Sequence, residues 1–104
     1  MVWGQGVPQD FAEAVTWHRK AADQGFANAQ FNLGVRYENG GGVTRDYLQA
    51  HKWFNLAAES FLAEMETNRR ETAVKNRNAV EAKMTARQIA EAQKLAREWK
   101  PKSK

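Results

Sequence analysis

The chain carries an internal repeat, and a repeat constrains the fold of its 104 residues more than any other feature. Residues 4–22 align with residues 40–58 at a constant offset of 36 and without a gap, and eight of the nineteen aligned positions are identical. The identities fall at helical spacing rather than at scattered positions. We therefore expect two copies of one structural unit.

Each copy is expected to form a helix with one buried face. After Asp10 and after Asp46, apolar or small side chains recur with the spacing i, i+3, i+4, i+7. Both aspartates are suited to cap a helix, because a carboxylate at this position accepts hydrogen bonds from the free amides of the first turn. Gly40 and Gly42 precede the second cap and predict a tight turn, with Val43 packed beneath it.

A further helix is predicted between the two copies, from about Ala27 to Asn39. Gly25 is expected to end the preceding helix as a left-handed cap residue. Gly34 has no side chain, so it permits close packing against the following helix at a cost in helix propensity of about 1 kcal/mol. The residues of this helix that are expected to face the core of the protein are Ala29, Leu33 and Tyr37.

The repeated positions form a motif that can be compared with a known family. They are Ala29, Leu33, Gly34, Tyr37, Gly40, Gly42, Val43, Asp46, Ala50, Trp53, Ala57 and Ala58. This pattern resembles the Sel1-like repeat, a relative of the tetratricopeptide repeat with a slightly longer period, over about residues 4–60. The resemblance implies an all-α fold, an α-solenoid of antiparallel helical hairpins that serves as an interaction scaffold and not as an enzyme. Residues 74–99 also resemble the closing segment of bacterial members of the family.

On this resemblance the chain is a single domain of about two and a half repeats with a C-terminal capping helix. It begins halfway through a repeat, either as a fragment of a longer solenoid or as a natural short form. A helix break is expected at Ser60, where Phe61 replaces the glycine of the first copy. The expected segments are a half repeat at 4–26 that lacks its first helix, a complete repeat at 27–60, a long helix at 61–83, a capping helix at 85–99 that Thr85 caps, and a disordered tail at 100–104.

Two surfaces are expected to contact partners. In tetratricopeptide-like solenoids the first helix of each repeat lines the concave surface, so the resemblance implies that a protein or peptide partner contacts Phe31, Asn32, Val35 and Arg36. Stacking of these side chains against a neighbouring helix is the alternative explanation.

The first helix of the chain lacks the partner that should cover one of its sides. An uncovered face of a few hundred Å² is the size that marks an interface. We therefore expect self-association through this end, as a homodimer that exchanges helices or as another assembly. A purely structural oligomerisation module is the alternative function. The residues expected on this face are Trp3, Phe11, Val15 and Trp17.

Charge is distributed unevenly along the chain. The net charge of +4 combines a net charge of −3 over residues 1–68 with a net charge of +7 over residues 69–104. Binding of nucleic acid or of an acidic ligand through this basic segment is a further alternative function, and binding to bases would also require aromatic residues for stacking. Here asparagine and glutamate interleave with the basic residues and no aromatic residue accompanies them, so a solvated helix surface is expected and nucleic acid is disfavoured.

Several classes of chemistry are disfavoured by composition. The chain has no cysteine, which excludes thiolate catalysis and cysteine-based metal sites. His18 and His51 occupy positions of the apolar stripes and are expected to be packed and hydrogen-bonded, so no metal and no cofactor are expected. The carboxylates of Glu64, Glu66, Glu71 and Glu81 are expected to be solvated.

No apolar run approaches the roughly 20 residues that cross a bilayer. The first eight residues lack the basic start and apolar stretch of a leader peptide. A cytoplasmic location is expected, with the periplasm as the alternative if the chain is a fragment.

Overall fold

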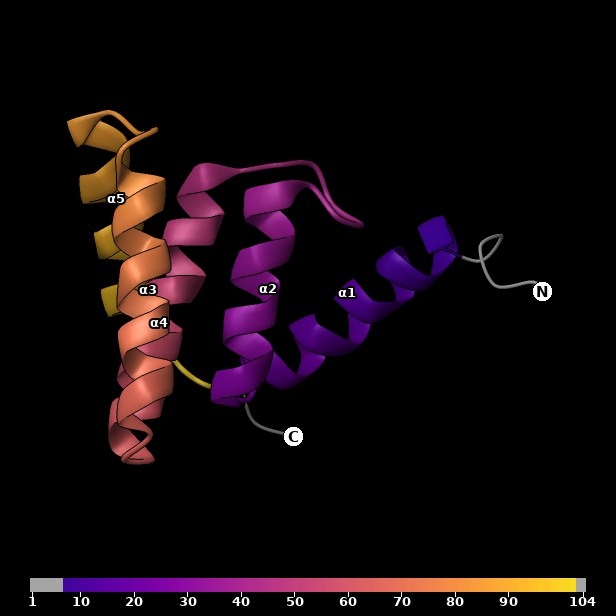
Figure 1. Cartoon of the computed structure of the whole chain (residues 1–104), viewed down its shortest axis with the longest axis horizontal. Coiled ribbons are helices and arrows are strands. Elements are labelled where there is room, and N and C mark those ends of the chain that lie inside the picture. Colours follow the sequence, from indigo (N-terminus) through magenta and orange to yellow (C-terminus); the bar gives the residue numbers. More distant parts are fainter. Residues whose placement is uncertain (1–6, 103–104) are drawn as a thin grey trace.

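The computed structural model describes residues 7–102, and those residues form five helices and no strand (Figure 1). This confirms the all-α prediction. Trp3, which was expected at the self-association face, lies outside the described residues. The helices are α1 (Val7–Asp23), α2 (Ala27–Asn39), α3 (Tyr47–Ala63), α4 (Thr67–Glu81) and α5 (Ala86–Glu98).

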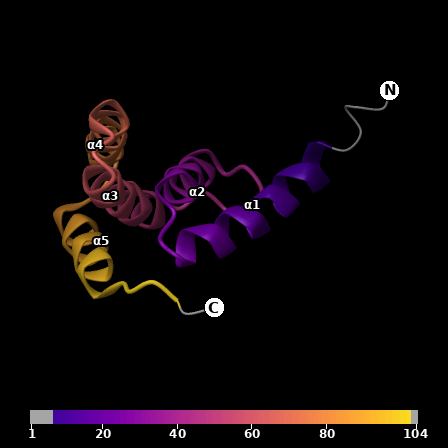
Figure 2. The same ribbon diagram turned by 90° about the horizontal axis from the view of Figure 1, so that it is seen from below.

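The central element is α3, which packs against α2, α4 and α5, while α1 packs against α2 (Figures 1 and 2). Its sequence explains this position, because successive residues of a helix point about 100° apart and α3 is apolar on several sides. Trp53, Phe54, Leu56 and Phe61 are all buried, although they leave the helix in different directions. A helix of this kind requires neighbours around most of its circumference.

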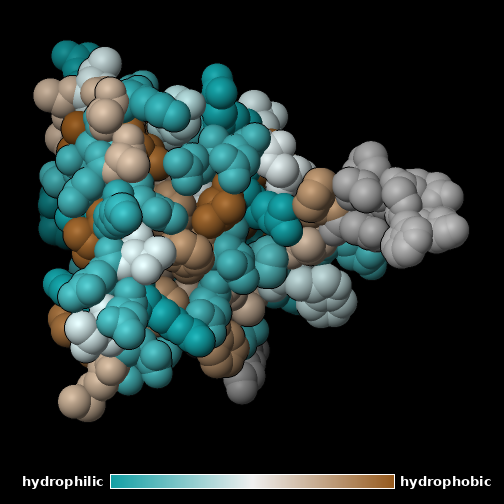
Figure 3. Space-filling view, in the orientation of Figure 1, coloured by the Kyte–Doolittle hydropathy of each residue, from teal (hydrophilic) through white to brown (hydrophobic). Residues whose placement is uncertain are grey.

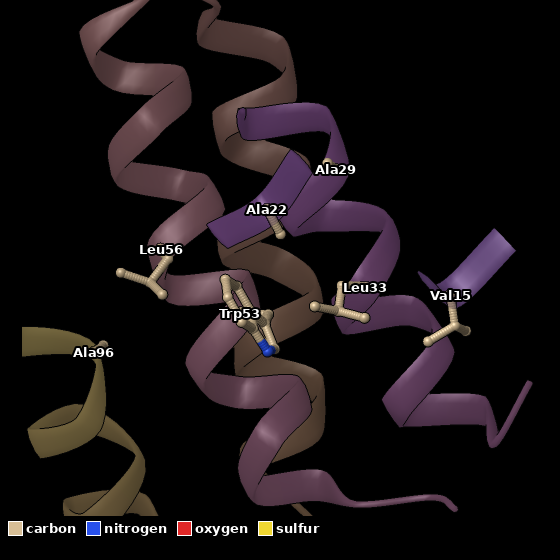
Figure 4. Packing of buried hydrophobic residues seen from close by; sticks show 7 residues of the cluster. All are labelled: Val15, Ala22, Ala29, Leu33, Trp53, Leu56 and Ala96. Carbon is tan, nitrogen blue, oxygen red and sulfur yellow. The ribbon is translucent and has the colours of Figure 1, made fainter. Parts of the chain in front are cut away.

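One part of the core joins four of the helices (Figure 4). Leu33 from α2 and Trp53 from α3 lie at its centre, and the remaining members are mostly small. Small side chains allow helix axes to approach closely. The buried members are Val15, Ala22, Ala29, Leu33, Trp53, Leu56 and Ala96.

The turn between α2 and α3 has the glycine geometry that the sequence predicts. Gly40 ends α2 with a φ of 77°, and Gly42 has a φ of 85°. A Cβ atom on Gly42 would lie 2.6 Å from the carbonyl oxygen of Phe11, so the turn packs directly against α1. The carboxylate of Asp46 accepts a hydrogen bond from the Gln49 amide at 3.1 Å, which confirms this cap.

The start of α1 differs from the prediction. The helix begins at Val7, so Asp10 lies inside it and is not its cap. Pro8 gives the physical reason, since proline has a φ suited to the first helical turn and no N–H that needs a partner there. The second copy has Thr44 at the equivalent position.

The predicted break between α3 and α4 occurs, but it falls at residues 64–66 and not at Ser60. The hydroxyl of Ser60 donates a hydrogen bond to the Gln30 side chain at 2.8 Å, Phe61 is buried, and α3 continues to Ala63 before the chain turns. Position 61 holds phenylalanine where the first copy has Gly25, so the left-handed cap residue that would end a helix at this point is missing. Met65 makes the turn with a φ of 61°, and the expected long helix at 61–83 is reduced to α4.

At the C-terminal end, Thr85 and Gln88 form the capping box that the sequence predicts, with hydrogen bonds of 3.0 and 3.1 Å. Trp99 packs edge-on against Trp53 with ring centroids 6.3 Å apart, which holds the end of α5 on α3. The chain then reaches α1. Lys102 donates its backbone N–H to the carbonyl of Asp23 at 2.7 Å and places its ammonium 3.3 Å from the Asp23 carboxylate, whereas disorder was expected from residue 100 onward.

A buried polar contact joins α3 to α4. His51 is fully buried, and its Nε2 lies 2.7 Å from a carboxylate oxygen of Glu81. The expectation of a packed, hydrogen-bonded His51 is therefore confirmed, and the expectation of a solvated Glu81 is wrong. A buried imidazole needs such a partner, because an unpaired polar group in the interior is costly.

We expect Glu81→Ala to lower the free energy of unfolding by about 1–3 kcal/mol, because it removes the partner of a buried imidazole. Glu81→Gln retains an acceptor at this position and is the matched control, with a smaller expected loss. Urea denaturation followed by circular dichroism measures both variants. Equal losses for the two variants would show that the hydrogen bond is not what stabilises this contact.

Gly34 provides a second test of the packing. A Cβ atom at this position would lie 2.8 Å from two ring carbons of the fully buried Phe54, which has no room to move. We expect Gly34→Ala to destabilise the fold by about 1–3 kcal/mol despite the better helix propensity of alanine. Gly41→Ala is the control, because the nearest obstacle there is the flexible end of Arg36. Thermal unfolding of both variants checks the expectation, and a stabilised Gly34→Ala would contradict it.

Candidate interaction surfaces

The first candidate surface is a groove between α2 and α4, which we call the α2–α4 groove. It has a volume of about 200 Å³, and apolar surface between these two helices is framed by polar side chains (Figure 3). Arg69 donates a hydrogen bond to Asn28 across the groove at 3.1 Å. The lining residues are Asn28, Phe31, Phe61, Arg69 and Thr72.

Phe31 forms the apolar part of this groove together with Phe61. Its ring lies 5.5 Å from that of Phe54 at an angle of 54°, and it remains partly exposed. Val35 is also partly buried and packs against the cluster of Ala50, Phe54 and Val80. Both residues therefore stack on neighbouring helices, as the alternative explanation required, while Phe31 still presents a face to the groove.

The other two residues predicted for this surface lie apart from the groove lining. Asn32 is exposed, and Arg36 places its guanidinium 4.7 Å from the ring centroid of Phe11 on α1. Sequence reasoning missed Asn28 and Thr72, and it considered Arg69 only as one of the residues of the basic segment. Arg69 and Thr72 lie on α4, outside the two aligned copies. Their spacing of three residues, which places them on the same side of one helix, was the only sequence feature that could have indicated them.

The second candidate surface is a larger groove over α3 and α4, which we call the α3–α4 groove. It has a volume of about 570 Å³. It stays open because α5 packs on α3 rather than forming a hairpin with α4, and the two helices lie on different sides of α3 (Figure 2). Leu62 is 59% exposed at this groove, and Val74 is partly exposed. The lining residues are Asn55, Ala58, Glu59, Leu62, Arg70, Glu71, Val74, Lys75, Arg77 and Asn78.

The third candidate surface is the side of α1 that was predicted for self-association, and we call the part of it formed by Phe11 and Trp17 the α1 surface. Phe11 and Trp17 are 39% and 63% exposed, whereas Val15 is buried and does not belong to this surface. Val15 contacts the Gly42 turn and the core, because α1 turns that side toward α2. Trp17 and its repeat equivalent Trp53 have different surroundings, since α2 covers Trp53 and no helix of residues 7–102 covers Trp17.

Two titratable groups have shifted pKa values. Partial burial, and to a smaller extent the nearby Arg36 guanidinium, lower the pKa of His18. Burial lowers the pKa of the Lys52 ammonium, and the carboxylate of Asp23 opposes that shift. Within residues 7–102, no three histidine or acidic side chains converge in a way that would hold a metal ion.

A helical hairpin stacked against further helices, with elongated grooves between them, defines a helical-repeat interaction scaffold. The comparison with known families agrees with this class. The model of the Sel1 repeat matches residues 2–26 and 27–60, and the chain therefore belongs to the Sel1 repeat family.

Similar proteins include a chitin synthase regulator SKT5 from Malassezia restricta, which is 42% identical over 53 residues, 51% of this chain and 4% of that protein. Protein sel-1 homolog 2 from Mus musculus is 42% identical over 59 residues, 56% of this chain and 9% of that protein. The chain thus spans less than a tenth of the length of these relatives.

A solved structure shows the same fold. The c5321 protective antigen of uropathogenic Escherichia coli, which has an SLR fold, superposes with a TM-score of 0.73 and 35% sequence identity over 92% of this chain and 20% of that chain. Separately, none of the helices described for residues 7–102 combines the length and apolar character that a membrane span requires.

Proposed function

We propose that the chain acts as a non-enzymatic adaptor that binds an extended segment of a partner protein in the α2–α4 groove. The observation that carries this proposal is the combination of an aromatic floor, Phe31 and Phe61, with polar side chains from two helices. Relatives described as regulators of chitin synthase support a role through contact with other proteins, although that description belongs to them.

The groove lining suggests the chemistry of the bound segment. An apolar side chain would rest on the two phenylalanine rings, while Asn28 and Thr72 have donors and acceptors for a peptide backbone. Arg69 uses Nη1 for its hydrogen bond to Asn28, and the ion pair of its Nε with Glu66 spans 3.9 Å between two largely exposed side chains and is weak, so its remaining N–H groups are available for a carboxylate. We therefore propose a partner segment that contains an apolar residue next to an acidic one.

The test is a selection from a random peptide library displayed on phage against the full chain, followed by fluorescence anisotropy of the enriched peptides. We expect enrichment of apolar residues adjacent to aspartate or glutamate. We further expect Arg69→Glu to weaken binding by at least about tenfold, the scale of a lost charge-assisted hydrogen bond.

Arg87→Glu is the matched control, because Arg87 is an exposed arginine on α5 that does not line either groove. It makes the same change in charge and should leave binding nearly unchanged. Equal losses for the two variants would indicate a general charge effect, and no enrichment of any peptide would contradict the proposed binding.

A second proposed function is self-association through the α1 surface, which the exposure of Trp17 favours. A tryptophan that is mostly exposed on a helix is costly to leave in water, and burial in an interface recovers that free energy. We expect wild type to show a mass above that of the monomer in light scattering at about 100 μM, and Trp17→Asp to remain monomeric at the same concentration. A monomeric wild type would contradict this function.

A further inference from the structure

Among residues 7–102, two helices each have one side without the neighbouring helix that the repeat pattern places there. The first is α1. Its positions Ala14, Trp17 and Ala21 correspond at the offset of 36 to Ala50, Trp53 and Ala57 of α3. The α3 residues are 0%, 1% and 0% exposed, because α2 and the core cover them, whereas Trp17 is 63% exposed. The α1 surface is therefore the side on which the repeat places the preceding helix of a hairpin.

The second is α4. In the complete repeat, α2 packs on α1 with one side and on its own hairpin partner α3 with another. Likewise, α4 packs on α3, but the helix that follows it, α5, packs on α3 instead of pairing with α4. The α3–α4 groove therefore lies open beside α4, on the side where a following helix would complete the hairpin.

We propose that α1 of one copy of the chain packs into the α3–α4 groove of a second copy, with Trp17 against Leu62 and Val74. This inference rests on the proposed self-association and names the surface that receives α1. In this contact α4 of one copy takes the place that the repeat gives to the helix before α1, and α1 takes the place of a helix that follows α4. The two helices together form a hairpin between copies.

The size and the charge of the α3–α4 groove favour α1 of a second copy as its occupant. The groove volume of about 570 Å³ suits a large aromatic side chain together with part of its helix. Three basic residues, Arg70, Lys75 and Arg77, and two acidic residues, Glu59 and Glu71, line the groove, and among residues 7–102 none of the three basic side chains has a carboxylate oxygen within 4.0 Å. Glu13 lies one helical turn before Trp17 and is exposed. The net charge of +7 over residues 69–104, which include α4, favours contact of the α4 side of the groove with the acidic Glu13.

The symmetry of the contact follows from the two surfaces that form it. The two partners use different surfaces, so the interface is heterologous, and after one contact the pair retains one free groove on one copy and one free α1 on the other. Such contacts close into rings, of which a dimer with reciprocal exchange of α1 is the smallest, or extend into open chains. Assembly should also weaken as salt rises, because part of the attraction is between exposed charges.

Two single variants separate this arrangement from a symmetric contact between α1 helices. Trp17→Asp removes the inserted side chain, and Leu62→Asp damages the groove; both residues are more than half exposed, so both variants should fold. Phe26→Asp is the matched control, because Phe26 is also 59% exposed and lies outside both surfaces. Circular dichroism and thermal unfolding establish that all three variants are folded.

The readout is the mass from light scattering of the full chain at about 100 μM. We expect wild type and Phe26→Asp to form assemblies, and each of the other two variants alone to be monomeric. An equimolar mixture of Trp17→Asp and Leu62→Asp should give heterodimers and nothing larger, because the mixture contains one intact α1 surface and one intact groove for each pair.

Each other outcome overturns the inference in a distinguishable way. If Leu62→Asp assembles like wild type while Trp17→Asp does not, self-association stands and the groove is not its receiving surface. If the mixture of the two variants stays monomeric, the two surfaces do not contact each other. If wild type itself is monomeric, the proposed self-association fails together with this inference.

Discussion

The structure depends on the burial of α3 by helices on three of its sides. Close approach of α2 makes this possible, since the backbone at Gly34 lies against the ring of Phe54. On the neighbouring side of α3, Trp53 fills the space between Leu33 and Trp99. The remaining helices take their positions from this packing: α4 covers His51, α5 covers Leu56, and α1 reaches the core through α2.

The sequence predicts the repeated part of the fold well because its chemistry is local. Glycines with positive φ, an aspartate cap and apolar spacing act over a few residues, and Gly25, Gly40 and Asp46 all have the expected geometry. One error has a local cause, because Pro8 lets α1 begin before Asp10, but the other arises from a distant contact. The end of α3 depends on Phe61 and on a hydrogen bond from Ser60 to Gln30, thirty residues away, which no local pattern reveals.

The interaction surfaces were less predictable for the same reason. One wall of each groove belongs to α4, which has low similarity to the repeated units and whose placement depends on packing with α3. Phe31 could be identified from α2 alone, but Asn28, Arg69 and Thr72 become one site only when the two helices are brought together. For α1, the repeat pattern indicated that Trp17 is exposed, but it could not show that Val15, which was expected on the same face, points to the core.

The contact between Lys102 and Asp23 gives this short solenoid a property that open repeat arrays lack. In such arrays each unit touches only its neighbours, so the end units can fray without disturbing the middle. Here the last described residue binds the end of the first helix, across 79 positions of sequence. Loss of order at the C-terminal end of α1 or at residues 99–102 therefore removes support from the other segment, and the last turn of α1 and the end of α5 should protect their amides from hydrogen exchange to a similar degree.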